Sequence, residues 1–349
     1  MTALEEVAPL DPLWVEVTRG TDTTNGVTES RHRVSAVVVD AEGRVVFRAG
    51  DPTQAVFPRS SIKPIQALAL VESGAAEAHG CSDREIALAC ASHGGERAHV
   101  ETAADWLARI GCGEGDLECG SHLPSDWDAA VALLQTGQAP NQLHNNCSGK
   151  HSGFLTLARH RNWPTKGYID HGHPVQQSVL GLLESMCGLD LSEAPWGIDG
   201  CGIPTFAIPL ANIALAMARL GLPDDQPERR QAACARVRRA MAAHPLLVAG
   251  HGRFCTRVIR RTEGRALVKT GAEGVYAACF PELGLGAALK AEDGATRAAE
   301  AAMGCLLAHL EILSGDDTAD LADLLEAPVV NRVGRRVGRI RATAGHDSG

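Results

Sequence analysis

Strand-like segments lie near both ends of the chain, and helical patterns fill its middle. Residues 14–20 alternate apolar and polar side chains, and residues 34–50 contain two apolar runs joined by a short polar turn. Strand patterns return over residues 266–293 and in a hairpin pattern at 329–341. Because one sheet can bury all of these apolar faces together, we predict an α/β (α+β) chain. Its mixed, mainly antiparallel sheet is closed by strands from both termini and flanked by helices.

The middle of the chain has helical periodicity. Helices are predicted at residues 57–74, 99–111, 154–160, 209–221 and 227–245, and a last one with Ala299, Met303, Leu306, Leu310 and Leu313 on one face. Ser82 and Glu85 form a capping-box pattern, and the apolar run that follows, residues 86–92, is short enough to predict a buried strand. We therefore expect a single domain over residues 1–349, with a mainly helical insertion at about 95–250.

The chain is acidic, because 33 Lys and Arg residues stand against 42 Asp and Glu residues, a net charge of −9. Contacts to phosphate need a basic surface, so this balance argues against nucleic-acid binding. Five arginines nevertheless gather in the C-terminal hairpin: Arg332, Arg335, Arg336, Arg339 and Arg341. We interpret them as the outer residues of an edge hairpin in which Val333, Val337 and Ile340 turn inward.

Eleven cysteines lie between Cys81 and Cys305 without any CxxC pair. No apolar stretch approaches the roughly 18 residues of a membrane-spanning helix, and no signal-peptide pattern opens the sequence. An odd number of cysteines without a secretion signal fits a disulfide framework poorly. We therefore expect a cytoplasmic protein without membrane contact. Most of its cysteines would be reduced core residues, and two or three of them would do chemistry.

Ser60 and Lys63 stand three residues apart at a predicted helix start, so their side chains share a helix face. A serine becomes a nucleophile when a neighbouring base takes its proton, and a lysine can do so only when it is neutral. Burial or a nearby positive charge would have to lower the lysine pKa from its usual value of about 10.4. By itself the pattern is also that of a capping serine beside a surface lysine.

A second motif, Lys269-Thr270-Gly271, lies on a predicted strand more than two hundred residues later. Serine hydrolases of the β-lactamase and penicillin-binding type have SxxK early and KTG late, on a strand that lines the same site. A second ammonium group near Lys63 would lower its pKa by repulsion. Ser92, at the end of the predicted strand 86–92, occupies the place of a further active-site serine, although no SxN triplet is present.

Two polar, turn-rich segments contain a candidate metal site. Cys147, Lys150 and His151 lie in the first segment, and Asp199 and Cys201 lie in the second. Two thiolates from such segments are plausible zinc ligands, and Asp, His or Lys with water could complete the shell. The spacing matches no standard zinc motif, so two ordinary buried cysteines remain an alternative, as does Cys201 as a nucleophile.

Five sequence blocks together resemble the signature blocks of the rhizobial-type, thermolabile L-asparaginases. They are FPRSSIKPIQALAL, ALACASHGGE, HNNCSGKHSGFL, GIDGCGIPTF and VKTGAEGVY, in this order. The likeness runs from about Trp14 to Arg341, nearly the whole chain. It implies a β-lactamase/transpeptidase-like fold, two Ser–Lys tandems and one Zn²⁺ ion held close to them.

The resemblance assigns these roles to residues of this chain by matching motifs. The first tandem falls on Ser60 with Lys63, and the second on Ser92 with Lys269. The zinc ligands of the family match Cys147, Lys150 and Cys201, and its acidic residue beside the metal matches Asp199. The residues alone do not favour lysine over histidine as the third ligand.

The resemblance further implies an enzyme, an amidohydrolase that splits L-asparagine into L-aspartate and ammonia. On this hypothesis Ser60 is the nucleophile, Lys63 accepts its proton, and donors near Ser60 and Gly94 stabilise the oxyanion. The zinc ion would organise the site, and the family suggests a homodimer.

Four residues are candidates for substrate binding. They are Arg59 for the α-carboxylate, with His93, Asn146 and Asp199 for the amino-acid end. Two other classes stay open: a β-lactam- or peptide-directed serine hydrolase, and a non-catalytic, zinc-stabilised binding protein. Glutaminase activity stays open too.

Overall fold

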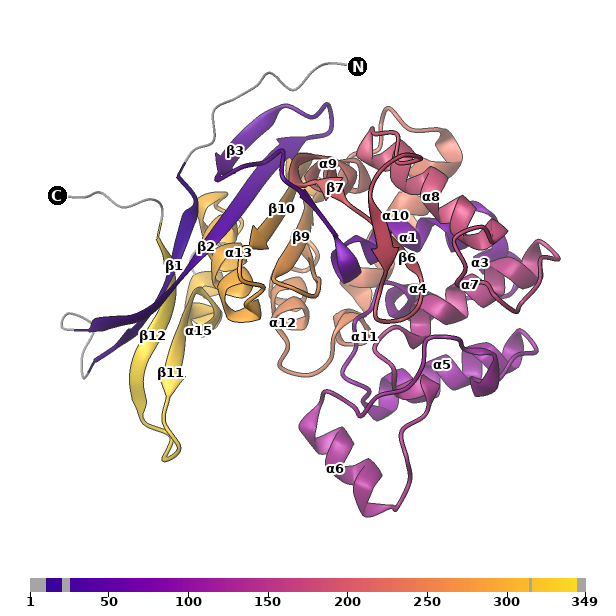
Figure 1. Cartoon of the computed structure of the whole chain (residues 1–349), viewed down its shortest axis with the longest axis horizontal. Coiled ribbons are helices and arrows are strands. Elements are labelled where there is room, and N and C mark those ends of the chain that lie inside the picture. Colours follow the sequence, from indigo (N-terminus) through magenta and orange to yellow (C-terminus); the bar gives the residue numbers. More distant parts are fainter. Residues whose placement is uncertain (1–10, 21–25, 314–315, 344–349) are drawn as a thin grey trace.

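An antiparallel sheet of eight strands organises this computed structural model, which describes residues 11–20, 26–313 and 316–343 (Figure 1). Along the sheet the order is β11-β12-β1-β2-β10-β9-β8, and β3 pairs with β2 beside this path. The strands are β1 (Leu13–Arg19), β2 (Val27–Asp40), β3 (Val45–Ala49), β8 (Leu267–Thr270), β9 (Val275–Phe280), β10 (Leu285–Ala291), β11 (Glu326–Val330) and β12 (Arg336–Thr343). Two short pairs lie outside this sheet: β4 (Ala55–Val56) with β7 (Ile208–Pro209), and β5 (Trp196–Ile198) with β6 (Pro204–Phe206).

Strands from the two ends of the chain lie next to each other. β1 pairs with β2 on one side and with β12 on the other, where Trp14 is opposite Thr343. This arrangement confirms the prediction that strands from both termini close one antiparallel sheet. The arrangement follows from the apolar strand segments, which would expose their faces to water if they were not paired in one sheet.

Helices cover both faces of the central strands. Residues Val34–Val39 of β2 form an unbroken buried run, which requires apolar cover on each side of the sheet. The helices α9 (Leu210–Gly221) and α13 (Thr296–His309) both contact β2, β9 and β10. We therefore place one of them on each face, with the core between sheet and helices (Figure 1).

The other helices gather mainly on one side of the sheet (Figure 1). They are η1 (Arg59–Ile62), α1 (Lys63–Gln66), α2 (Leu68–Glu72), α3 (Ala75–Ala78), α4 (Asp83–Ala89), α5 (Arg97–Arg109), η2 (Glu114–Asp116), α6 (Trp127–Gln135), η3 (Gln142–His144), α7 (Ser148–His160), α8 (Pro174–Cys187), α10 (Glu228–Ala243), α11 (Pro245–Val248), α12 (Phe254–Arg261), η4 (Pro281–Leu283), α14 (Asp316–Asp320) and α15 (Ala322–Leu325). Within residues 95–250 the structure has mostly helices, together with the short strands β5, β6 and β7. That this segment is an insertion stays a prediction. Over the described ranges, every helix is too short or too polar to cross a membrane.

One predicted strand is wrong. Residues 86–89 of this run belong to the helix α4, and residues 90–92 follow its end. The helix starts at the predicted capping box, where Glu85 accepts hydrogen bonds from Ser82. Helix α4 packs against α5, α7 and α10, so nearly every side of it is buried. An all-round buried helix has no polar stripe, and its short apolar run looks the same as a buried strand.

The C-terminal hairpin forms as β11 and β12, but one of its residues was placed wrongly. Val333 lies in the turn and is 85% exposed, whereas Ile340 packs against the core. Arg336 and Arg339 both form ion pairs with Glu326 across the hairpin. These contacts are typical of the edge hairpin that the sequence suggested.

Candidate active site

Two buried lysines hold the hydroxyl group of Ser92 between them. Lys269 Nζ lies 2.8 Å from Ser92 Oγ, and Lys63 Nζ lies 3.2 Å from the same oxygen. The three residues come from distant segments, because Lys63 begins α1, Ser92 follows α4, and Lys269 lies in the edge strand β8. Lys63 is fully buried, and Ser92 is 8% exposed. The fold thus brings three of the four predicted catalytic residues to one hydroxyl group.

Ser60 lies in the 3₁₀ helix η1, directly before Lys63. Side chains three residues apart eclipse each other in a 3₁₀ helix, and Lys63 donates its backbone N–H to the carbonyl oxygen of Ser60. Ser60 and Lys63 therefore share a face, but among the described residues no hydrogen bond joins the Ser60 hydroxyl to Lys63. Ser60 is half-buried, whereas Ser61 is fully buried and donates to Pro58 O at 2.7 Å.

The strand that carries Lys269 ends against η1. A Cβ atom on Gly271 would lie 2.8 Å from Pro58 O and 3.2 Å from Ser61 N, so only glycine allows the two backbones to come this close. Gly271 thus provides room for η1, and it thereby sets the position of Ser60 relative to Lys269.

Arg59 has a left-handed backbone conformation, with φ +50°. Such a conformation is strained for a residue with a side chain, and strain of this kind is concentrated at functional sites. Its side chain forms an ion pair with Asp199, in which Nε and Nη2 both lie 2.8 Å from Oδ1. Burial by itself would raise the pKa of Asp199, but Lys150 and Arg59 hold it below its usual value. The pair therefore places a guanidinium and a carboxylate side by side next to Ser60.

The two predicted metal-site cysteines lie together beside the serine cluster. Lys150 Nζ donates to Cys201 Sγ at 3.0 Å, and Lys63 Nζ donates to Cys147 Sγ at 3.1 Å. Helix α7 begins at Ser148, so Cys147 and Lys150 lie at its first turn, whereas Cys201 comes from the turn between β5 and β6. Lys63 therefore contacts both Ser92 and Cys147, and it joins the two clusters that the sequence predicted separately.

The two cysteine side chains and Lys150 shift one another's pKa. The hydrogen bond from Cys147 and the charge of Lys150, opposed by burial, lower the pKa of Cys201 to about 5. The same hydrogen bond and burial raise the pKa of Cys147 to about 12. Burial disfavours the charged form of Lys150, but the two sulfur atoms outweigh this effect and raise its pKa above the usual value. These shifts favour a thiol at Cys147 beside a thiolate at Cys201, with the Lys150 ammonium group next to the thiolate.

Lys269 is the lysine whose charge is least favoured. Burial, followed by the repulsion of Lys63, lowers the pKa of Lys269 to about 7. At neutral pH a large share of Lys269 is therefore the free amine, which can accept a proton from the Ser92 hydroxyl.

Three positions that the sequence offered for binding are occupied by contacts within the protein. His93 is buried, with Nε2 2.9 Å from Ser148 Oγ and Nδ1 accepting the backbone N–H of Gly95. The side-chain oxygen of Asn146 accepts from Cys147 Sγ at 3.1 Å. The N–H of Gly94, a predicted oxyanion donor, donates to Ala249 O at 3.0 Å, and the N–H of the neighbouring Gly95 is also used. In this structure the polar atoms named here therefore have partners within the protein, and a role in binding substrate stays a prediction.

The donor atoms at the two cysteines fit a zinc ion. In the described ranges no three His, Cys, Asp or Glu side chains are close enough to hold a metal ion. The amine of Lys150, which contacts Cys201, lies where it could be a third donor to a metal ion bound by Cys147 and Cys201. Two thiolates and one nitrogen leave a fourth position of a tetrahedral zinc ion open.

Some contacts of the site have no counterpart in the sequence pattern. Lys63 Nζ also donates to the backbone carbonyl groups of Ala91 and Asn146. A carbonyl oxygen carries no residue-type signal, so only the fold reveals it. The link between Lys63 and Cys147 was likewise not predicted.

Comparison with known proteins gives one family. The family model described as L-asparaginase II matches residues 15–342. A search of curated proteins found no match. Among solved structures, a crystal structure of Mglu matches with a TM-score of 0.44 and 14% identity, over 82% of this chain and 69% of that chain. A crystal structure of native Mglu in 4.3 M NaCl has the same TM-score of 0.44 and 14% identity, over 82% of this chain and 63% of that chain, which is less than two thirds of its length.

Proposed function

The chain belongs to the L-asparaginase II family, and from this premise we propose that it hydrolyses L-asparagine to L-aspartate and ammonia. The observation that supports the proposal most directly is the Ser92 hydroxyl between two buried lysines. A lysine with a pKa near 7 beside a serine is what proton transfer in covalent serine catalysis requires.

We assign the nucleophile to Ser60. Ser60 is half-buried and lies next to the Arg59–Asp199 pair, whereas Ser92 is almost fully buried and hydrogen-bonded to two lysine nitrogens. A nucleophile must reach the substrate, and Ser60 is the more accessible of the two. Ser60 also shares the face of η1 with Lys63. The Lys63 amine is hydrogen-bonded to Ser92, and Ser92 is in turn hydrogen-bonded to Lys269.

The reaction follows from this network in two steps. Ser60 Oγ bonds to the side-chain amide carbon while its proton passes to the Lys63–Ser92–Lys269 network. The network then protonates the leaving nitrogen, the C–N bond breaks, and ammonia leaves a β-aspartyl ester. Water then breaks the ester C–O bond, and the proton it loses restores the Ser60 hydroxyl. Among the described residues, the Ser60 backbone N–H has no hydrogen-bond partner, which makes it a candidate oxyanion donor.

The amino-acid end of asparagine carries one positive and one negative charge, which match the Arg59–Asp199 pair. The Arg59 guanidinium would bind the α-carboxylate and the Asp199 carboxylate would bind the α-amino group. The pair is partly exposed, with 25% of the Arg59 side chain and 11% of the Asp199 side chain accessible. Substrate can therefore replace the internal ion pair at the rim of the site.

Cys147, Lys150 and Cys201 would hold one Zn²⁺ ion. When bound, the ion supplies a fixed positive charge that organises the site and favours the thiolates. Lys150 and Cys147 would each have to lose a proton on binding, so zinc affinity should fall at low pH.

Three further proposals concern the fold relationship, the location and the oligomeric state. The SxxK pattern at η1 and the KTG pattern on the neighbouring edge strand support a β-lactamase-like arrangement. The free state of all eleven cysteines fits a reducing cytoplasm. A homodimer is part of the same proposal, and the mass in solution tests it.

Ammonia release tests the function and the nucleophile together. The wild-type protein should release ammonia from L-asparagine and should not react covalently with a penicillin-like probe. Ser60→Ala and Ser92→Ala should each lower the rate about 10³-fold or more, because the residues act as one unit. Ser61→Ala is the matched control and should keep most activity, since its hydroxyl bonds only to Pro58. Full activity of Ser60→Ala would refute the assignment. Release of ammonia from glutamine alone would refute the substrate.

Elemental analysis tests the metal. Wild-type protein should hold one zinc ion per chain, and the double variant Cys147→Ala/Cys201→Ala should hold little or none. Cys112→Ala removes a partly exposed cysteine elsewhere and should not change the zinc content. A full equivalent of zinc in the double variant would place the metal at another site.

A further inference from the structure

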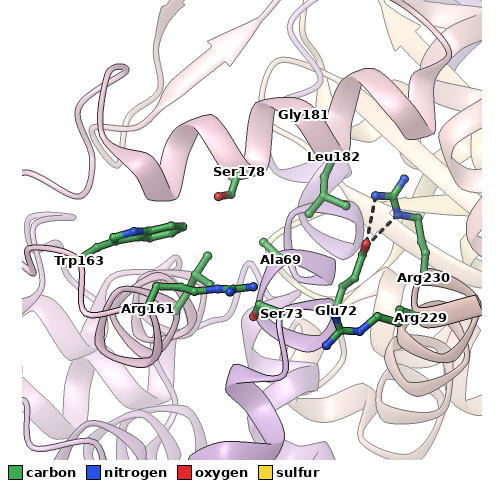
Figure 2. Close-up of a pocket in the computed structure, with 11 residues that line it drawn as sticks. Ala69, Glu72, Ser73, Arg161, Trp163, Ser178, Gly181, Leu182, Arg229 and Arg230 are labelled. Atoms are coloured by element: carbon green, nitrogen blue, oxygen red, sulfur yellow. Dashed lines mark hydrogen bonds and ion pairs between the residues drawn. The ribbon is translucent and has the colours of Figure 1, made fainter. Parts of the chain in front are cut away.

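A cavity away from the proposed active site lies among the helices α2, α7, α8 and α10, and Figure 2 shows the side chains that line it. Its volume is about 420 Å³, which is within the range of small-molecule sites in proteins. None of the residues assigned above to catalysis, substrate or metal lines it. The cavity is therefore a candidate site that the proposed reaction does not use.

The charge of the lining is positive. Three arginines stand against a single glutamate, and Glu72 is already bound by Arg230, with Nε 2.9 Å from Oε2 and Nη2 3.2 Å from Oε1. Among the described residues, Arg161 and Arg229 form no ion pair. Figure 2 shows Arg161 reaching from the Trp163 side toward the middle of the cavity, with Arg229 beside the Glu72–Arg230 pair. Two exposed arginines without an ion-pair partner in the described part of the chain thus line one open pocket.

Other parts of the lining are apolar. The Trp163 ring lies at one end, and Leu157 and Leu182 add apolar surface. An aromatic ring next to a guanidinium group offers a face for a flat or apolar part of a ligand. The cavity therefore combines a positive region with an apolar one.

Gly181 keeps one wall of this cavity open. It lies within the helix α8, where a glycine costs about 1 kcal/mol relative to alanine. A Cβ atom at this position would meet no atom within 4 Å, so internal packing does not require glycine here. A larger side chain would instead project into the cavity.

We propose that this cavity binds a small organic dianion, either a phosphate monoester or a dicarboxylate. Its negative groups lie between Arg161 and Arg229, where each guanidinium can donate two hydrogen bonds. Its apolar part packs against Trp163. The site is independent of the proposed asparaginase reaction.

Titration calorimetry of the full chain tests the proposal, with phenyl phosphate, succinate and inorganic phosphate as probes at constant ionic strength. At least one of the two organic dianions should bind one site per chain. Its affinity should exceed that of inorganic phosphate, which has no apolar part. Comparison of phenyl phosphate with succinate shows whether the site prefers a phosphate monoester or a dicarboxylate.

Two independent kinds of variant locate the binding. Arg161→Gln and Arg229→Gln should each weaken the affinity about tenfold, the loss of one charge-assisted contact. Gly181→Leu should abolish binding by filling the cavity. Arg260→Gln, which changes an exposed arginine on α12, is the control and should bind as the wild type does. Circular dichroism of each variant is the control for correct folding. The proposal is wrong if neither organic dianion binds, or if binding survives both Gly181→Leu and the arginine substitutions.

Discussion

Lys269 is the residue on which the pH dependence of the site should rest. Its pKa is lowered to about 7, so it is protonated at acidic pH and becomes a free amine as the pH rises. If the network needs this amine to accept a proton, kcat/KM should rise through about pH 7 and then level off.

Lys269→Met should remove this rise and lower kcat/KM about 10²- to 10⁴-fold, the usual contribution of a general base. Lys290→Met is a matched control, because Lys290 also has a lowered pKa but lies in β10 outside the cluster. That variant should keep the wild-type profile. A rise near pH 7 that persists in Lys269→Met would mean that another group controls the rate.

The residue types of the site were predictable, but their contacts were not. Spacing placed Ser60 and Lys63 on one face, and the KTG motif placed Lys269 on a strand. The sequence did not show that Lys63 lies between Ser92 and Cys147, because this depends on how α1, α4 and α7 pack. His93 was a candidate for binding the amino-acid end of the substrate. Here it is buried, and both of its nitrogens have partners.

At the scale of secondary-structure elements, the contact between β8 and η1 sets the distance between Ser60 and Lys269. Gly271→Ala would place a Cβ atom 2.8 Å from Pro58 O, and a backbone atom cannot give way without moving η1. We expect a loss of about 1–3 kcal/mol in the free energy of unfolding, together with a clear loss of activity.

Urea unfolding and ammonia release measure these two effects. Gly115→Ala is the control, because a Cβ atom at that exposed position meets nothing within 4 Å. It should change stability by less than about 0.5 kcal/mol. Wild-type stability and activity in Gly271→Ala would show that η1 does not depend on this contact.

Elements with a clear pattern were predicted well, and those without one were not. The hairpin of β2 and β3 and the amphipathic helix α5 have the expected periodicities. Helix α4 was missed because neighbours bury it on several sides. The short strands β5 and β6 escaped prediction because three residues are too few to show alternation.

At the scale of the whole molecule, the cysteines report on the packing. All eleven are free, nine are buried, and Cys112 and Cys305 are partly exposed. Alkylation of the native protein should therefore modify at most these two residues quickly, whereas alkylation in denaturant should modify eleven. Intact mass after alkylation in native buffer and after alkylation in denaturant, both without reductant, gives the two numbers. A native protein that loses free thiols without reductant would contradict the reduced state.

The pairing of β1 with β12 has a consequence for how the protein is made. The Thr343 hydroxyl donates to Trp14 O across 329 residues of sequence, a long-range contact of the kind that slows folding. Ser60, Ser92 and Lys269 all precede β12 in the chain, so a nascent chain can contain these three residues while the outer edge of β1 is still unpaired. Open edges recruit strands of other chains, whereas the finished edge strand β11 is short and carries Pro328. Pairing of β12 with β1 thus removes an open strand edge that an incomplete chain exposes.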